Sequence, residues 1–173
     1  MCIRDSTVPV HYQVRAGSWQ LDTNHMDELV DQDYNHLTDE EMDVLKDKAS
    51  SYGKTFMMNP KRLKAVAEDI CSHYKAFVEP NGFKAQVVAF SREACVLFKE
   101  HIDDILGEQY SDVVFSGGQN DKPLLRKYHK SKQEIKECTD LFKKKDSELK
   151  IIIVQSMLLT GFDAPNEQVM YLD

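Results

Sequence analysis

Three short loops hold the residues whose types and spacing could bind a phosphate group. They are Phe90-Ser91-Arg92, Ser116-Gly117-Gly118 and Thr160-Gly161-Phe162-Asp163, and each follows a short apolar stretch. Hydroxyl groups, an arginine, and glycines that let a backbone approach a ligand are groups that suit phosphates. If the apolar stretches are parallel strands of one sheet, the loops leave the same edge, where open α/β sheets bind ligands. The sequence therefore predicts a phosphate-binding edge.

Each loop also has a purely structural explanation. Ser91 could serve only as the N-cap of a helix, Gly117-Gly118 could be only a turn, and Asp163-Ala164-Pro165 could only position the next strand. Arg92 could pair with a carboxylate such as Glu93 instead of a phosphate. Both interpretations stay open for each loop, and the expected position of all three at one edge favours the functional one.

The rest of the chain shows no other spacing that indicates chemistry. The four cysteines and six histidines lack metal-ligand spacing, so no metal site is predicted, and the cysteines are expected to be reduced thiols. No catalytic-triad spacing occurs, so no catalytic residue is predicted. No apolar stretch approaches the roughly 20 residues of a membrane helix, so no membrane partner is expected.

Charge is distributed unevenly along the chain, whose net charge is −7. Residues 21–47 contain ten acidic residues and one lysine, whereas residues 122–150 contain ten basic and five acidic residues. The basic segment could follow nucleic-acid phosphates even in an acidic protein. It could equally be a solvated, lysine-rich helix face.

Strands and helices that would position the loops alternate along the chain. Strands are expected at Val8–Val14, Ala85–Phe90, Val113–Phe115, Leu149–Val154 and Val169–Leu172. Helices are expected to begin at a capping box Thr38–Glu41, at Asn59-Pro60, at Ser91 and at a second capping box Ser131–Glu134, and a polar loop is expected at Gln119–Lys130. Apolar periodicity predicts Phe77, Ile105 and Leu141 on the inward faces of these helices. The order predicts an α/β fold, with a mostly parallel sheet covered by helices on both faces and preceded by an acidic helical segment.

Several of these segments together resemble a known family. Lys84–Ala94 (KAQVVAFSREA) resembles motif IV of superfamily 2 helicases, in the version found in the R (motor and restriction) subunit of type I restriction enzymes. Phe115-Ser116-Gly117 resembles the following strand end, Ile151–Asp163 resembles motif V, and Val169–Asp173 resembles the strand before motif VI. The resemblance extends from Thr7 to Asp173.

The resemblance implies a RecA-like (P-loop NTPase type) second motor domain of an ATP-dependent DNA translocase that belongs to a DNA restriction system. It makes six residues candidates for DNA-backbone contact or motor coupling: Ser91, Arg92, Ser116, Gly117, Thr160 and Gly161. Asp163 becomes the candidate for the nucleotide side of the ATP cleft. The resemblance further implies ATP and Mg²⁺ as cofactors of the full-length protein. Its implied partners are double-stranded DNA and the modification (M) and specificity (S) subunits, in the cytoplasm of a bacterium or archaeon.

The chain departs from the helicase pattern at several points. Gln155-Ser156 stands where many helicases have Thr-Asp, and Lys132–Lys136 lacks a Gln-x-x-Arg pattern that some relatives show. The sequence also lacks a G-x-x-x-x-G-K-[ST] loop, an acidic Walker B box, the arginine of motif VI and a nuclease carboxylate cluster. Because ATP hydrolysis needs a phosphate cradle, a held Mg²⁺ and a charge-stabilising arginine, this chain alone is expected to have neither ATPase nor nuclease activity.

The expected domain organisation has three parts. Residues 1–6 (MCIRDS) resemble a translated sequencing adaptor and are expected not to be native, residues 7–58 form a strand and an acidic helical lead-in, and residues 59–173 form a motor domain truncated at its C-terminal end. Two alternative functions remain. Another superfamily 2 DNA or RNA helicase would lack an upstream nuclease domain. The second alternative is a non-enzymatic α/β binding module. It would be disfavoured if the protein binds DNA in a salt-dependent manner and an Arg92→Ala, Thr160→Ala double variant loses that binding.

Overall fold

The computed structural model describes residues 10–15, 53–54 and 56–173. Residues 10–15 belong to a different unit from residues 53–173 and are described by themselves. They form no strand and are exposed, so the predicted strand Val8–Val14 is wrong for residues 10–14. A β-branched alternating pattern forms a strand only where a neighbouring strand supplies pairing and packing, and residues 10–14 take part in no strand pair. The helix predicted from Thr38–Glu41 lies outside the described residues.

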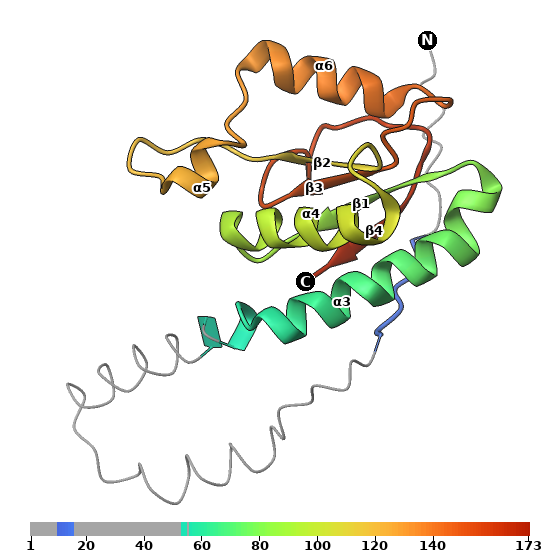
Figure 1. The fold of residues 1–173 in the computed structure, drawn as a ribbon. Coiled ribbons are helices and arrows are strands. Elements are labelled where there is room, and N and C mark those ends of the chain that lie inside the picture. The colour runs from blue at the N-terminus through green and yellow to red at the C-terminus, as the bar shows by residue number, and fades with distance from the viewer. Residues whose placement is uncertain (1–9, 16–52, 55) are drawn as a thin grey trace, which may run out of the picture. The chain divides into compact units, whose positions relative to one another are not determined.

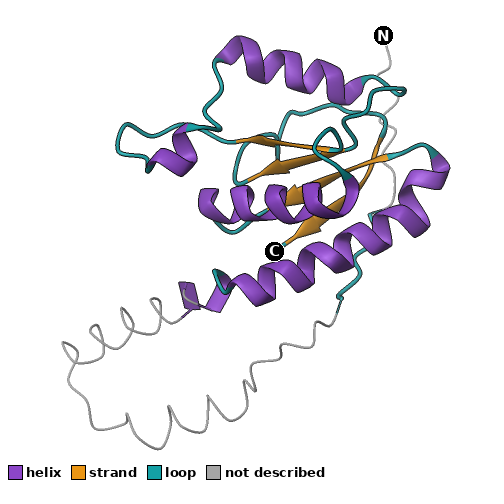
Figure 2. Cartoon of the chain, viewed as in Figure 1, coloured by secondary structure: helices purple, strands orange, loops and turns teal. Residues whose placement is uncertain are grey.

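The sheet has four strands, all paired in parallel. Figures 1 and 2 show it between the helices. They are β1 (Lys84–Val88), β2 (Ser111–Val114), β3 (Ile151–Val154) and β4 (Glu167–Leu172), in the spatial order β2-β3-β1-β4. Strand β1 is central and pairs with both β3 and β4, and β2 pairs with β3. Each boundary lies within two residues of its prediction. The predicted parallel sheet is therefore confirmed.

Helices cover both faces of this sheet. Helices α3 (Pro60–His73) and α4 (Arg92–Leu106) lie on one side, and α6 (Lys132–Lys143) lies on the other (Figure 1). Alternate side chains of β3 divide accordingly, because Ile151 and Ile153 join the core with α3 and α4, whereas Ile152 and Val154 join the core with α6. A strand buried on both faces needs a continuous apolar run, which explains the sequence IIIV. The two-faced α/β prediction is confirmed.

Side-chain caps fix where the three long helices begin. The Asn59 Oδ1 accepts hydrogen bonds from the backbone N–H groups of Lys61 and Arg62, and the Ser91 Oγ accepts one from Ala94. Ser131 and Glu134 form the predicted capping box. Each cap satisfies N–H groups that have no partner within the helix, so the predicted helix starts are confirmed. No helix in the described ranges is long and apolar enough to cross a membrane.

The inward position predicted for Phe77 is wrong, since its side chain is 64% exposed. Helix α3 continues as a π-helical turn, Tyr74–Val78, and ends in a 3₁₀ turn at Gly82, whose φ of +74° suits glycine. The wider π turn keeps Tyr74 and Val78 buried and turns Phe77 outward.

The inward positions predicted for Ile105 and Leu141 are also wrong, because both side chains are exposed. Helix α6 faces the sheet through Cys138 and Phe142, which are four residues apart, and this narrow stripe leaves Leu141 outside. In α4, the core-facing stripe runs through Ile102, which is buried, and Leu106, four residues later, which packs against the core. Ile105 lies outside this stripe.

Candidate functional site

The parallel arrangement brings the loops after β1 and β2 together at the carboxyl edge of the sheet. Arg92, in the first turn of α4, donates a hydrogen bond from its Nη1 to the Ser116 carbonyl oxygen at 3.2 Å. The Ser91 hydroxyl caps α4 at 3.1 Å from the Ala94 nitrogen and lies 3.3 Å from the Met58 sulfur, just before α3. Ser91 therefore has the structural role that was one of its two predicted interpretations.

Asp121 is the residue that holds this group of loops together. Its Oδ2 accepts hydrogen bonds from the Gly118 backbone N–H at 2.7 Å and from Arg92 Nη1 at 2.6 Å, and it lies 2.8 Å from His129 Nε2. The Gly118 hydrogen bond, followed by His129 and Arg92, lowers the pKa of this carboxyl below its usual value. Arg92 thus pairs with a carboxylate, as one interpretation held, but the partner is Asp121 and not Glu93.

Sequence reasoning missed Asp121, which lies in the segment predicted to be only a polar loop. That segment also contains a short helix, α5 (Pro123–Arg126). The available signal was an aspartate three residues after a Gly-Gly pair, a spacing at which its side chain can reach back to a turn N–H. Its partners Arg92 and His129 lie 29 residues before it and eight after it, so local sequence could not reveal the buried position.

The two glycines of the second loop make room for this network. A Cβ atom on Gly117 would lie 2.9 Å from His129 Nδ1, and one on Gly118 would lie 2.9 Å from Asp121 Oδ1 and 3.0 Å from Arg92 Nη1. Real Cβ atoms do not come so close to other heavy atoms. Internal packing therefore explains both glycines, without the close approach of a ligand.

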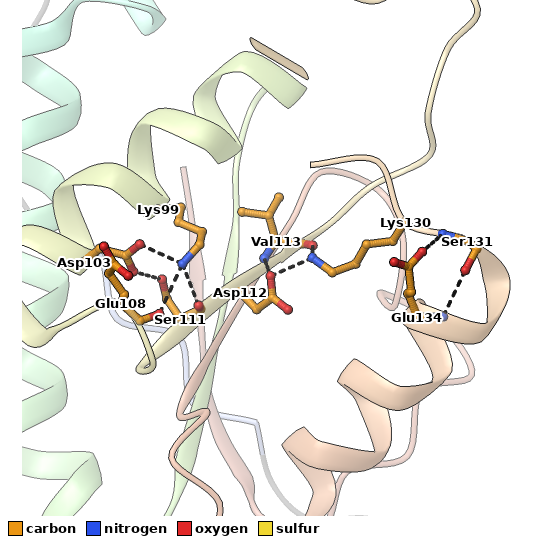
Figure 3. Close-up of polar contacts among 9 residues, drawn as sticks. All are labelled: Lys99, Asp103, Glu108, Ser111, Asp112, Val113, Lys130, Ser131 and Glu134. Carbon is orange, nitrogen blue, oxygen red and sulfur yellow. Dashed lines mark hydrogen bonds and ion pairs between the residues drawn. The ribbon is translucent and has the colours of Figure 1, made fainter. Parts of the chain in front are cut away.

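The chain segment 119–130, which contains α5, is held at both ends. Asp121 fixes its start, and at its end Lys130 donates from its Nζ to Asp112 Oδ1 at 2.6 Å and to the Val113 carbonyl oxygen at 2.8 Å (Figure 3). Lys99, which belongs to α4, binds the same strand and donates to the Ser111 carbonyl oxygen at 2.8 Å. Because β2 is an edge strand, these lysines satisfy carbonyl groups that no neighbouring strand reaches.

An open depression of about 510 Å³ lies beside this network. It is lined by Lys54, Met58, Phe90, Ser91, Arg92, Glu93, Lys122 and Gln155. Three of these residues are cations and one is an anion, so the depression has an excess of positive charge. Gln155, which departs from the common helicase pattern, follows β3 directly and is among the lining residues.

The third predicted loop takes a different course. Residues 155–166 connect β3 to β4. Four of their apolar side chains, Met157, Leu158, Phe162 and Ala164, pack on the α6 side of the sheet, where the Phe162 ring lies 6.1 Å from the Phe142 ring. Thr160, Gly161 and Asp163 are exposed, and no hydrogen bond or ion pair in the described part of the chain joins them to Ser91, Arg92 or Ser116. Gly161 has a φ of +72° and Leu158 a φ of +62°.

Of the seven predicted site residues, the structure thus brings four together: Ser91, Arg92, Ser116 and Gly117. The other three, Thr160, Gly161 and Asp163, lie in the exposed part of the β3–β4 connection.

Other reactive groups offer little chemistry within the described ranges. No cluster of three or more His, Cys, Asp or Glu side chains in residues 10–15, 53–54 and 56–173 could hold a metal ion. Burial raises the pKa of the Cys71 thiol to about 11 and those of Cys95 and Cys138 to about 12. These thiols stay protonated at neutral pH, which suits packing and not nucleophilic attack.

Comparisons with known proteins place these observations in a family. Residues 8–173 match the family model for the type I restriction enzyme subunit R domain 3. The chain is 35% identical over 137 residues to a putative type I restriction enzyme MjaVIIP endonuclease subunit of Methanocaldococcus jannaschii, over 69% of this chain and 13% of the relative. It is 37% identical over 120 residues to the HindI endonuclease subunit of Haemophilus influenzae, over 65% of this chain and 11% of the relative. A third relative, the putative MjaIXP endonuclease subunit of M. jannaschii, is 29% identical over 95% of this chain and 16% of its own length.

Proposed function

The chain belongs to the family of type I restriction enzyme R subunits, in the region of their domain 3, and from this premise we propose that it forms their second RecA-like motor domain. The chain spans only 11–16% of the length of these relatives. The proposed activity is therefore that of a larger enzyme, which moves double-stranded DNA with ATP hydrolysis and restricts foreign DNA. We propose that it works in the cytoplasm, with modification (M) and specificity (S) subunits.

The observation that supports this proposal most is the pairing of β1 with β3. These strands carry the segments that resemble motifs IV and V, and they run side by side in register, with Val88 opposite Val154. The two motif-like segments therefore leave the sheet at the same edge. A motor domain needs such an edge, because one surface must respond to a nucleotide and also contact the DNA backbone.

In this proposal the candidate residues act through the loops that follow β1, β2 and β3. Motor coupling is assigned to Ser91, Arg92, Ser116 and Gly117, whose contacts are internal. DNA-backbone contact or motor coupling is assigned to the exposed Thr160 and Gly161, and the nucleotide side of the cleft to Asp163. Contacts of this kind bind phosphates and carry no sequence information, so DNA sequence would be recognised by the S subunit.

ATP and Mg²⁺ would be bound mainly by parts of the enzyme other than this chain. The sequence lacks a phosphate-binding loop, and the described residues contain no cluster of metal ligands around Asp163. We therefore expect no ATP turnover by the 173-residue chain alone. Measurable turnover by the purified chain would contradict this expectation.

Translocation by the assembled R, M and S subunits tests the proposal. Thr160→Ala in the R subunit should slow ATP-driven DNA translocation, measured by displacement of a third DNA strand from a triplex. Thr139→Ala is the matched control, because the Thr139 hydroxyl only bonds its own helix at the Lys136 carbonyl oxygen. Absence of ATP-driven translocation by the wild-type complex would refute the function, and wild-type speed in Thr160→Ala would refute the coupling role.

A further inference from the structure

Two lysines at the depression have no charged partner among the residues that the structure describes. Lys54 and Lys122 are exposed and line the depression, and their side chains make no hydrogen bond or ion pair with any described residue. Arg92, the third cation there, is already bound to Asp121 and to the Ser116 carbonyl oxygen. The free positive charge of the depression therefore comes from the lysines, which neither the resemblance nor the motif pattern identified.

Positive charge continues from the depression along α5. Lys122 occupies the N-cap position of α5, and the exposed Arg126 and Lys127 follow at its end. Asp121 contributes to the rigidity of this helix, because its carbonyl oxygen accepts a hydrogen bond of 2.7 Å from Arg126 Nε. Since the segment is fixed at Asp121 and at Lys130, these cations are held on a defined surface.

An extended ligand fits this surface better than a single phosphate. One phosphate group could be neutralised by one or two of these cations, and the others would then have no partner. A DNA strand carries one negative charge for about every 3.4 Å of helix axis, so successive phosphates can meet successive cations. The N-terminus of the 15-residue helix α4 adds partial positive charge at the same depression.

We propose that Lys54 and Lys122 bind phosphates of the DNA backbone at this depression, and that Arg92 mainly ties the loop after β2 to α4. This inference rests on the proposed function, because it takes DNA as the polymer that the chain meets. The contacts are electrostatic and independent of base sequence, so they hold the duplex without selecting a site.

Salt-dependent binding of a short DNA duplex to the 173-residue chain tests the assignment. A Lys54→Ala, Lys122→Ala double variant should bind more weakly, and the slope of log affinity against log salt should become shallower by about two. The matched control is Lys132→Ala, Lys136→Ala, which removes the same charge from exposed positions on α6 and should leave the slope unchanged. An equal change of slope in both double variants, or no duplex binding by the wild-type chain at low salt, would overturn the proposal.

Two further measurements separate the remaining outcomes. If the Lys54, Lys122 double variant loses affinity for ADP and keeps its affinity for duplex, the phosphate belongs to a nucleotide and the DNA assignment is wrong. Arg92→Ala should lower the thermal unfolding midpoint and change the salt slope of duplex binding by less than one. If Arg92→Ala instead reduces the salt slope by a full unit and leaves the unfolding midpoint unchanged, the role assigned to Arg92 is wrong.

The same double variant in the assembled R, M and S complex distinguishes this inference from the proposed function. If the wild-type complex translocates DNA and the Lys54→Ala, Lys122→Ala complex does so equally well, the inference is refuted and the proposed function stands. If the wild-type complex does not translocate DNA, but the chain binds duplex with the expected salt slopes, the proposed function is refuted and the inference stands.

Discussion

Gly117 lies so close to the His129 ring that a methyl group has no room. A Cβ atom there would be 2.9 Å from Nδ1, 3.0 Å from Cε1 and 3.1 Å from Cγ, whereas carbon atoms in contact are normally about 3.5–4.0 Å apart. The ring cannot move freely, because Nε2 pairs with Asp121 at 2.8 Å and the ring packs edge-on against Phe115. Since Gly117 does not have a positive φ, the penalty is steric. Gly117→Ala should therefore reduce the free energy of unfolding by about 1–3 kcal/mol.

A double-mutant cycle isolates this contact. Urea unfolding of the wild type, Gly117→Ala, His129→Ala and the double variant gives the coupling between the two positions. With the ring removed, alanine at position 117 has space, so its penalty should nearly vanish in the His129→Ala background. An equal penalty in both backgrounds would refute the packing explanation. Weaker DNA binding by the double variant than by His129→Ala, at equal stability, would show that Gly117 also serves a ligand.

Three further changes test other parts of the structure. Gly161→Ala should lower the free energy of unfolding, measured in urea, by about 1–2 kcal/mol; the φ of +72° causes this penalty, because a Cβ atom there would touch nothing. Gly53→Ala is the control: a Cβ atom there also lies in open space, but the φ of Gly53 is not positive, so this variant should show no such penalty. Burial raises the pKa of Glu167 from 4.5 to about 7, so the folded state keeps a proton that the unfolded chain has lost. Stability should therefore fall as pH rises from about 4.5 to 7, and Glu167→Gln should remove that fall in a series of thermal midpoints; an unchanged pH profile would contradict the burial of this carboxyl. Phe142→Ala should reduce the free energy of unfolding by about 3–5 kcal/mol, since the fully buried ring packs against the sheet and lies beside Phe162, and a loss below about 1 kcal/mol in urea would contradict this packing.

Helix starts were predictable because their signals are local. Asn59, Ser91 and Ser131 each satisfy N–H groups two or three residues further on, so a few residues contain the whole interaction. The inward faces were less predictable, as Phe77 shows, because a single π turn rotates every later position of the helix. Periodicity assumes 3.6 residues per turn, and nothing in the local sequence announced the wider turn.

The candidate site was predictable only in part, for a related reason. The position of Ser91, Arg92 and Ser116 at one edge follows from parallel strands, which the alternation of elements indicated. Asp121 joins three separate segments, and its role therefore depends on the tertiary fold. The course of the β3–β4 connection likewise depends on Phe162, which packs against α6 and leaves Thr160 exposed.

The cations of this chain differ in what they already bind, and this difference decides which of them can serve a ligand. Lys99 and Lys130 donate hydrogen bonds to carbonyl groups of the edge strand β2, and Arg92 is held by Asp121. An additional phosphate at these residues would have to compete with a partner that the fold supplies. Lys54 and Lys122 have no such competitor among the described residues, so their charge is available without loss of an internal contact. The side chains of Lys132 and Lys136 also lack a partner among the described residues, but they lie on α6 and do not line the depression. The salt slope of duplex binding should therefore reflect only the lysines that are both uncommitted and at the depression, a smaller set than the ten basic residues in 122–150.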